Sequence, residues 1–298
     1  MTPDSLPSTR GVLTKIDRPA WTPPHRPSPW IERASQGLLR ALSPSLPPVT
    51  TATPPAVLKP FTPFSVSRSD GAARRGHLAA TWFPTDEAAA RGVVILVHPW
   101  HGRGQAYFHR HRRIPVLRDA GYHVMTVDLG GVGASGPQRR DFADRDVVDA
   151  VRAAARRDLP VHLWGVCLGG FYAALAMAGL PEVRGGLFED VTSHPLTWSR
   201  RRAPWGRPAY RFFQTALPTA NRYLDLFEQA PRLADRSTAW VSGAWNETVT
   251  AAETWELARR ARGRALIVDD ADHLECMRRG RRPMVELALQ TFAAAEAG

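Results

Sequence analysis

A group of closely spaced glycines in the middle of the chain constrains its fold most strongly. The segment Gly165-Val166-Cys167-Leu168-Gly169-Gly170 follows the apolar residues Val161 to Trp164 and precedes a run of small residues from Phe171 to Ala178. A sharp turn from a strand into a helix leaves no room for side chains on either side of its apex, so it requires glycine there. The pattern therefore predicts a strand, a tight turn with Cys167 at its apex, and a helix.

The 298-residue chain repeats this alternation of strand and helix from about residue 61 onward. Apolar segments typical of strands occur at 64–67, 77–83, 93–97, 122–127, 161–164, 183–188, 239–241 and 265–268. We expect the first two to form an opening β-pair, and the others alternate with helical patterns such as the one after Asp141. Alternating segments of this kind predict an α/β domain over residues 61–298, with a mostly parallel sheet and helices on both faces.

Residues 1–60 have a different character, because they contain 13 of the 26 prolines. Proline at this density prevents continuous regular structure and indicates a proline-rich N-terminal arm. One amphipathic helix is predicted within it at about residues 29–42, where Ser28 can cap the helix and Pro29 suits its first turn. We expect this helix to dock on the α/β domain. A dimer contact and an interfacial membrane helix are open alternatives, and the oligomeric state is left open.

The basic composition does not by itself indicate nucleic-acid binding. The formal net charge is +11, but Lys15 and Lys59 are the only lysines and the arginines are spread along the chain. No recognisable nucleic-acid module accompanies them, so we expect no nucleic-acid partner. Two cysteines cannot form a disulfide framework, no basic-then-apolar leader opens the sequence, and no apolar run approaches the length of a membrane span. We therefore expect a cytoplasmic protein.

The predicted turn places Cys167 where a thiol can act as a nucleophile. The N–H groups and the positive dipole end at the start of the next helix favour a thiolate and stabilise an oxyanion. The alternative is a buried structural cysteine. A nucleophile needs a base, and His273 follows the last predicted strand in Val268-Asp269-Asp270-Ala271-Asp272-His273-Leu274. His273 has two alternatives: a helix cap, or a metal site with Cys276, which would supply only two ligands where structural zinc takes four.

Over residues 61–296 the chain resembles the α/β-hydrolase family, with several motifs in the expected order. Val97-His98-Pro99-Trp100-His101-Gly102 is similar to the family's His-Gly loop after its third strand, and Asp128-Leu129-Gly130-Gly131-Val132-Gly133-Ala134-Ser135 looks like the loop after its fourth. The box at 165–170 resembles the G-x-C-x-G-G turn of dienelactone hydrolases and is similar to that of polyhydroxyalkanoate synthases. The other loops resemble the serine-aminopeptidase and monoglyceride-lipase-like branch.

This resemblance implies an α/β-hydrolase fold with Cys167 as nucleophile and His273 as catalytic histidine. It also implies an oxyanion hole made by the backbone N–H groups of Trp100 and Leu168, and a cap insert at about residues 195–236, between the sixth and seventh strands. No metal and no organic cofactor is required.

The residue that orients His273 is where the chain departs from the family pattern. Gly243-Ala244-Trp245-Asn246 stands where the family has Gly-x-x-Asp. In a resting thiolate–imidazolium pair, both ring nitrogens carry protons, so an asparagine need only accept a hydrogen bond. Asn246 is therefore consistent with a cysteine nucleophile. Glu247, and Asp190 after the sixth strand, are the alternatives.

The expected cap is rich in aromatic residues and in arginines between residues 198 and 227. It is predicted to form an apolar lid over an acyl pocket, and its arginines either bind a carboxylate or phosphate or form a solvated face. The leading hypothesis is a hydrolase that cleaves a carboxylic ester, lactone or thioester of a small-molecule acyl substrate through an acyl-cysteine intermediate. The alternatives are an acyltransferase with the same Cys–His site and a catalytically inactive binding protein.

Overall fold

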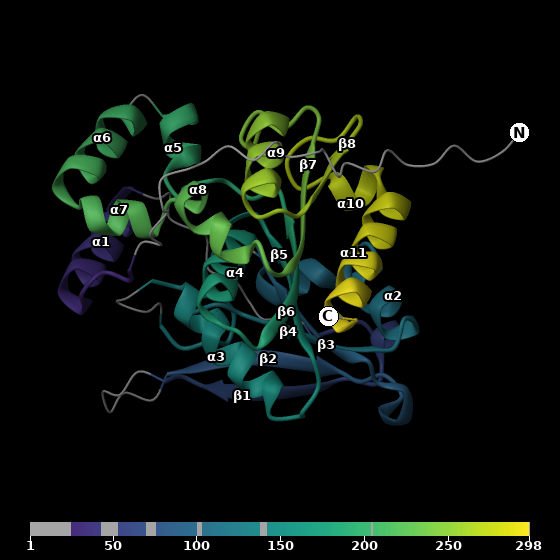
Figure 1. Ribbon diagram of the computed structural model, residues 1–298. Helices are drawn as coiled ribbons and strands as arrows, with labels where there is room; N and C mark the ends of the chain where they lie inside the picture. Colours follow the sequence, from purple (N-terminus) through teal and green to yellow (C-terminus); the bar gives the residue numbers. More distant parts are fainter. Residues whose placement is uncertain are drawn as a thin grey trace, which may run out of the picture.

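The computed structural model describes residues 25–42, 53–69, 76–99, 103–137, 142–203 and 205–297. An eight-stranded sheet runs through its centre in the order β1-β2-β4-β3-β5-β6-β7-β8 (Figure 1). The strands are β1 (Thr62–Ser67), β2 (His77–Phe83), β3 (Gly92–Val97), β4 (Tyr122–Val127), β5 (Val161–Val166), β6 (Val183–Glu189), β7 (Ser237–Gly243) and β8 (Arg264–Val268). β1 and β2 pair antiparallel, and β2 is antiparallel to β4. The remaining pairs are parallel, which confirms the predicted mostly parallel sheet.

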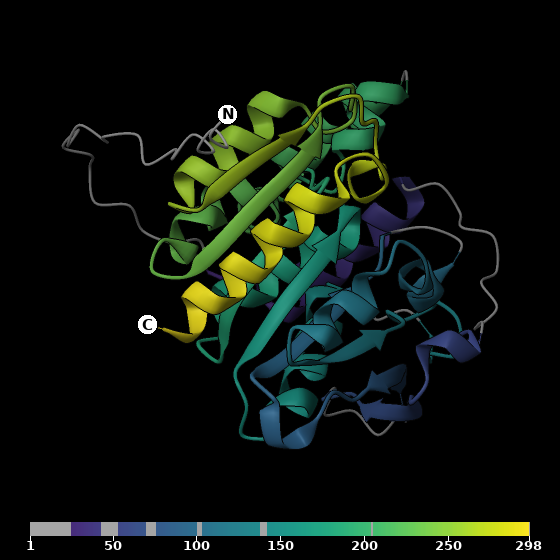
Figure 2. The same ribbon diagram turned by 90° about the vertical axis from the view of Figure 1, so that its right-hand side faces the viewer.

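The central strands are apolar along their whole length because helices cover both of their faces. Every residue of β3, β4 and β5 is buried, as expected for parallel strands in the middle of such a sheet. One face packs on α3 (Asp144–Ala155), α4 (Cys167–Gly179) and α9 (Ala251–Arg260). The other packs on α2 (Arg113–Asp119), α10 (Cys276–Arg279) and α11 (Arg281–Glu296). Figure 2 shows α11, in yellow, lying along the strands on this second face.

Four short helices occupy the connection between β6 and β7. They are α5 (Thr197–Arg202), α6 (Gly206–Ala216), α7 (Pro218–Tyr223) and α8 (Leu226–Gln229). In Figure 1, α5, α6 and α7 lie together at one end of the molecule, with α1 (Pro29–Leu42) beneath them. We call the segment from α5 to α8 the cap.

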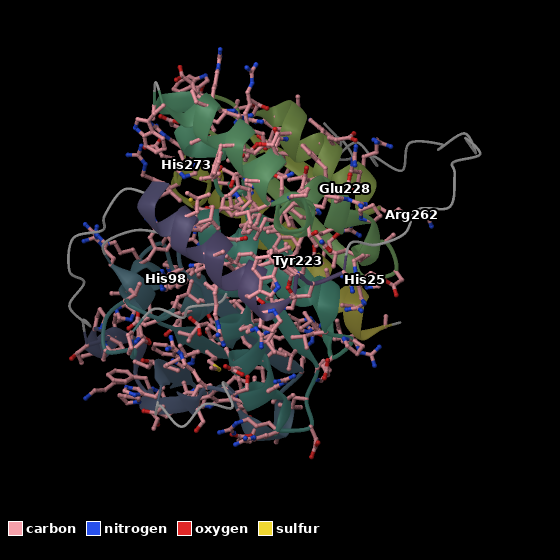
Figure 3. All side chains as sticks on the ribbon, turned by 90° about the vertical axis from the view of Figure 1, so that its left-hand side faces the viewer. His25, His98, Tyr223, Glu228, Arg262 and His273 are labelled. Atoms are coloured by element: carbon pink, nitrogen blue, oxygen red, sulfur yellow. The ribbon has the colours of Figure 1, made fainter. Side chains whose placement is uncertain are left out.

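Buried charged groups fasten α1 to the domain. Arg26, just before α1, donates from Nη1 to Asp144 Oδ2 at 2.7 Å and to the Tyr223 hydroxyl at 2.9 Å. Glu32 is fully buried, pairs with Arg26, and accepts from the Phe142 N–H at 2.9 Å. Figure 3 shows α1, in purple, beside Tyr223. Residues 1–24 and 43–52 of the N-terminal arm lie outside the described residues.

No helix in the described ranges has both the length and the apolar character needed to cross a lipid bilayer.

Candidate active site

Cys167 occupies the apex of a sharp turn between β5 and α4. β5 ends at Val166 and α4 begins at Cys167, whose φ of +53° lies in the left-handed region that non-glycine residues rarely adopt. The flanking glycines permit this turn. A Cβ on Gly169 would lie 2.0 Å from the carbonyl oxygen of His98, and one on Gly165 would lie 2.4 Å from the Cα of Gly170. The close approach of these backbones therefore explains the glycine pattern.

His273 reaches Cys167 from the loop that follows β8. Its Nε2 lies 3.3 Å from Cys167 Sγ, across 106 residues of sequence. Burial lowers the pKa of the His273 ring, but the charge and hydrogen bond of Cys167 act in the opposite direction, and the net pKa lies above the ordinary value. The structure thus brings together the two residues that the sequence analysis paired.

Asn246, in the turn after β7, contacts the other nitrogen of the ring. Its Nδ2 lies 3.1 Å from His273 Nδ1. Its Oδ1 accepts hydrogen bonds from the backbone N–H groups of Thr248 at 3.0 Å and Val249 at 2.9 Å. Its Nδ2 also donates to Asp190 Oδ1 at 2.9 Å. Two backbone donors and one carboxylate acceptor therefore fix the orientation of this amide.

This orientation differs from the sequence-based expectation that Asn246 accepts a hydrogen bond from His273. The amide nitrogen faces the ring, because the loop uses the amide oxygen to satisfy two backbone N–H groups. A proton on Nδ1 would oppose the N–H of Asn246, so this orientation of the amide favours a neutral ring that accepts at Nδ1 and carries its proton on Nε2, toward Cys167. The charge of Cys167 and the amide of Asn246 therefore exert opposing effects on the protonation of His273.

Asp190 joins the three loops that build the site. It follows β6, is fully buried, and accepts hydrogen bonds from Asn246, from the N–H of Leu274 at 2.7 Å and from the N–H of Gly243 at 3.3 Å. Burial, followed by the nearby charge of Glu189, raises the pKa of Asp190 to about 7. Asp190 forms no direct hydrogen bond with His273, so it acts on the ring through Asn246 and Leu274. Glu247, the other alternative, is exposed and faces the cap.

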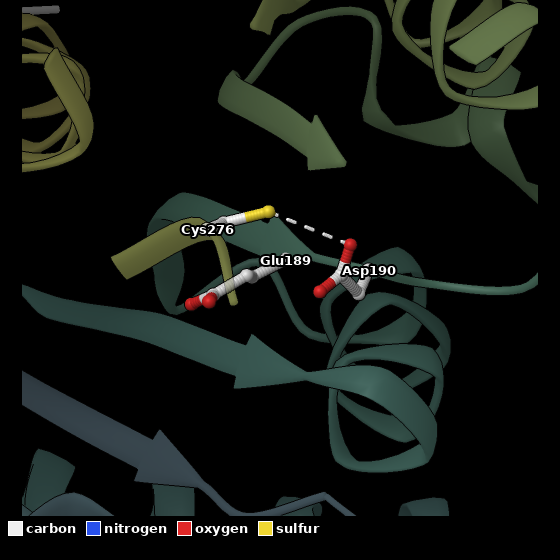
Figure 4. Close-up of side chains that lie close together, drawn as sticks. All are labelled: Glu189, Asp190 and Cys276. Atoms are coloured by element: carbon white, nitrogen blue, oxygen red, sulfur yellow. Dashed lines mark hydrogen bonds between the residues drawn. The ribbon is translucent and has the colours of Figure 1, made fainter. Parts of the chain in front are cut away.

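Glu189, Asp190 and Cys276 form a buried cluster whose ligand atoms lie within 4.8 Å of one another (Figure 4). Its groups already have partners. Glu189 binds Arg113 at 2.7 and 2.9 Å, and Asp190 holds the loops described above. Burial and the Asp190 carboxylate raise the pKa of the Cys276 thiol, which therefore stays protonated. The donor set fits a hydrogen-bonded structural cluster better than a metal ion, which requires deprotonated ligands.

The structure describes one of the two residues whose backbone N–H groups are predicted to form the oxyanion hole. Leu168 lies in the first turn of α4, directly after Cys167. Trp100 lies outside the described residues. His98, which begins the same loop, is buried; its Nε2 accepts from the Leu129 N–H at 3.0 Å while Nδ1 bonds the carbonyl of Pro99 at 2.8 Å. His98 therefore supports the loop.

The fold, the turn at Cys167 and the histidine after β8 define the α/β-hydrolase class. A sequence profile described as the alpha/beta hydrolase family matches residues 94–297, and the chain belongs to this family.

Solved structures of low sequence identity share the fold. An esterase of Pyrococcus furiosus has a TM-score of 0.66 at 14% identity, covering 85% of this chain and 97% of that chain. The alpha/beta hydrolase GrgF from Penicillium has a TM-score of 0.59 at 14% identity, with coverage of 80% and 100%. An enol-lactonase of Burkholderia xenovorans has a TM-score of 0.55 at 14% identity, with coverage of 73% and 97%. No curated protein matches the sequence.

Proposed function

We propose that this chain hydrolyses a carboxylic ester, lactone or thioester through an acyl intermediate on Cys167. The observation that carries the proposal is the 3.3 Å contact between His273 Nε2 and Cys167 Sγ, at the turn where the family places its nucleophile. The names of the structural neighbours, which include an esterase and an enol-lactonase, support this class of reaction. Both cysteines are free thiols, which supports a reducing compartment such as the cytoplasm.

The proposed reaction has two halves. In the first, the Cys167 thiolate attacks the carbonyl carbon, a C–S bond forms, and the bond to the leaving alcohol or thiol breaks as His273 donates its Nε2 proton to it. In the second, water attacks the thioester carbonyl while His273 takes its proton, and the acid and the Cys167 thiol are released. The backbone N–H of Leu168, with that of Trp100, would stabilise the oxyanion in both halves.

A second candidate function follows from the orientation of Asn246. Both halves of the reaction pass through a ring that carries a proton on Nδ1, and Asn246 presents a donor to that atom. In a serine site, an amide at this position costs about ten-thousandfold in rate because it selects the wrong tautomer. The same geometry thus favours a protein that binds an acyl compound with little or no turnover.

One experiment separates the two functions. The full chain is incubated with a panel of acyl esters and thioesters, and the intact mass and released acid are followed together. Hydrolysis predicts a transient acyl mass on the peptide that contains Cys167 and released acid, both lost in Cys167→Ala. Saturable binding without adduct or released acid, unchanged in Cys167→Ala, would instead establish the binding protein.

A further inference from the structure

We propose that a pocket between the cap and the loop after β7 binds a carboxylate or phosphate group of the ligand. The pocket has a volume of about 410 Å³ and is lined by Arg200 and Arg201 of α5, Arg207 of α6 and Glu247. That the bound anion belongs to the acyl substrate rests on the proposed function; that the pocket binds an anion does not.

Arg201 forms the wall of this pocket. It donates from Nη2 to Glu253 Oε2 at 2.9 Å and also donates to the carbonyl oxygen of Thr248. Glu253 is itself held in place, since its Oε1 accepts from the N–H of Ser193 at 2.9 Å. The charge of Arg201 is therefore balanced, and its role is to attach α5 to the loop after β7.

Arg200 and Arg207 supply the positive charge that is not held in an ion pair, and Arg200 also acts electrostatically on the Asp225 carboxylate. The Arg200 guanidinium stacks over the ring of Tyr210, with Cζ 4.9 Å from the ring centroid. Stacking holds the plane of the guanidinium and leaves its N–H edge available for a planar or tetrahedral anion. Neither Arg200 nor Arg207 forms an ion pair with any residue in the described part of the chain. With Arg201 balanced by Glu253, the two guanidinium groups of Arg200 and Arg207 against one lining carboxylate, Glu247, leave the pocket with net positive charge.

The pocket and the candidate active site share one loop. Thr248 donates its N–H to the side chain of Asn246 and accepts a hydrogen bond from Arg201 through its carbonyl. Glu247, which lines the pocket, directly follows Asn246. Cys167 and His273 are not among the lining residues, so the pocket does not enclose the atoms of the candidate active site. This arrangement suits a ligand whose carbonyl lies at Cys167 and whose charged end lies under the cap.

The first test measures binding without catalysis. The full chain carrying Cys167→Ala is titrated calorimetrically with glutarate, with inorganic phosphate and with uncharged glutaramide. We expect saturable binding of at least one anion and none of glutaramide, and the tighter anion identifies the favoured group. Adding Arg200→Gln or Arg207→Gln should weaken that binding about tenfold, the usual effect of losing one charged hydrogen bond. Arg211→Gln is the matched control, because Arg211 is exposed on α6 and does not line the pocket.

Three results would overturn the proposal: no saturable binding of either anion, equal binding of glutaramide, or an equal loss of affinity in Arg211→Gln. A second test uses the 4-nitrophenyl ester of glutaric acid and its methyl-blocked analogue. The ratio of kcat/KM for the acidic over the blocked ester should be about ten and should fall to about one in the double variant Arg200→Gln with Arg207→Gln. If neither ester is hydrolysed, the proposed function fails, while the calorimetry still decides whether the pocket binds an anion.

Discussion

The side-chain amide nitrogen of Asn246 lies 3.1 Å from Nδ1 of His273, so the residue beside this ring is a donor where the proposed reaction needs an acceptor. The same nitrogen donates to a carboxylate, Asp190, 2.9 Å away. An acidic group is thus present at the site, one hydrogen bond removed from the ring.

Replacing this amide with a carboxylate should raise activity. In Asn246→Asp, the new side chain can accept from His273 Nδ1–H while retaining the N–H groups of Thr248 and Val249. Asp190 can hold a proton beside it, because its pKa is already raised to about 7. We expect kcat/KM to increase by about tenfold to a thousandfold, measured on one turned-over ester.

The control for this substitution exchanges the two groups. Asp190→Asn combined with Asn246→Asp preserves the net charge and the contact between positions 190 and 246. It should match or exceed the single variant if placement of the carboxylate is what matters. A fall in activity in both variants would contradict the prediction, because it would mean that the amide of Asn246 supports the reaction better than a carboxylate at position 246.

The two cysteines should differ strongly in reactivity toward iodoacetamide. Cys167 is partly exposed and contacts His273, whereas Cys276 is fully buried and its thiol pKa is raised. At pH 7, in the folded protein, alkylation should be confined to the peptide containing Cys167, as read by peptide mass. His273→Ala should slow that alkylation by about tenfold or more, because the ring no longer stabilises the thiolate. Equal labelling of both cysteines would contradict this assignment.

Asp190 should make stability depend on pH between about 4 and 7. Its folded-state pKa of about 7 lies above the ordinary carboxyl value of 3.8, so between these two values the folded protein binds more protons than the unfolded chain. The contribution to stability is therefore fully present below about pH 4, falls as the pH rises toward 7, and changes little above that. Relative to Asp190→Asn, the wild type should lose about 2 to 3 kcal/mol between pH 5 and pH 8, measured by urea unfolding. A pH-independent difference between the two proteins would refute the raised pKa.

Glu32 should be important for stability although it lies outside the α/β domain. Glu32→Ala leaves Arg26 and the N–H of Phe142 without their partner in a buried setting, so the free energy of unfolding should fall by about 3 kcal/mol. Glu286→Gln, which removes an exposed pair with Arg282 on α11, should change it by less than about 0.5 kcal/mol. Equal effects in the two variants would show that α1 contributes little to the fold.

The sequence alone was sufficient to locate the two site residues that lie directly after the ends of strands. Cys167 lies between glycines that only a tight turn explains, and His273 follows the last strand, so both could be located before their contact was seen. The fold class followed in the same way from the alternation of strands and helices, and the family match confirms it.

The remaining features depend on contacts that sequence spacing does not encode. The amide of Asn246 points as it does because Thr248 and Val249 turn their N–H groups toward it, which a motif cannot reveal. Asp190 meets Asn246 across 56 residues because β6 and β7 are neighbours in the sheet. The sequence did show that Asn246 replaces the aspartate of the Gly-x-x-Asp pattern. That replacement indicates altered chemistry beside His273, but it does not reveal whether the amide donates to the ring or accepts from it.

The attachment of α7 determines how a ligand can enter. The Tyr223 hydroxyl at the end of α7 donates to Asp144 at 2.8 Å, and Arg26 binds both groups, so one side of the cap is anchored to α3 by buried charged hydrogen bonds. Swinging the cap outward as a rigid body would break both hydrogen bonds of the Tyr223 hydroxyl at once. We therefore expect a ligand to approach Cys167 from the side where α5 and α6 meet the loop after β7. A ligand entering there would pass Arg200 and Arg207 before its carbonyl group reached the thiol.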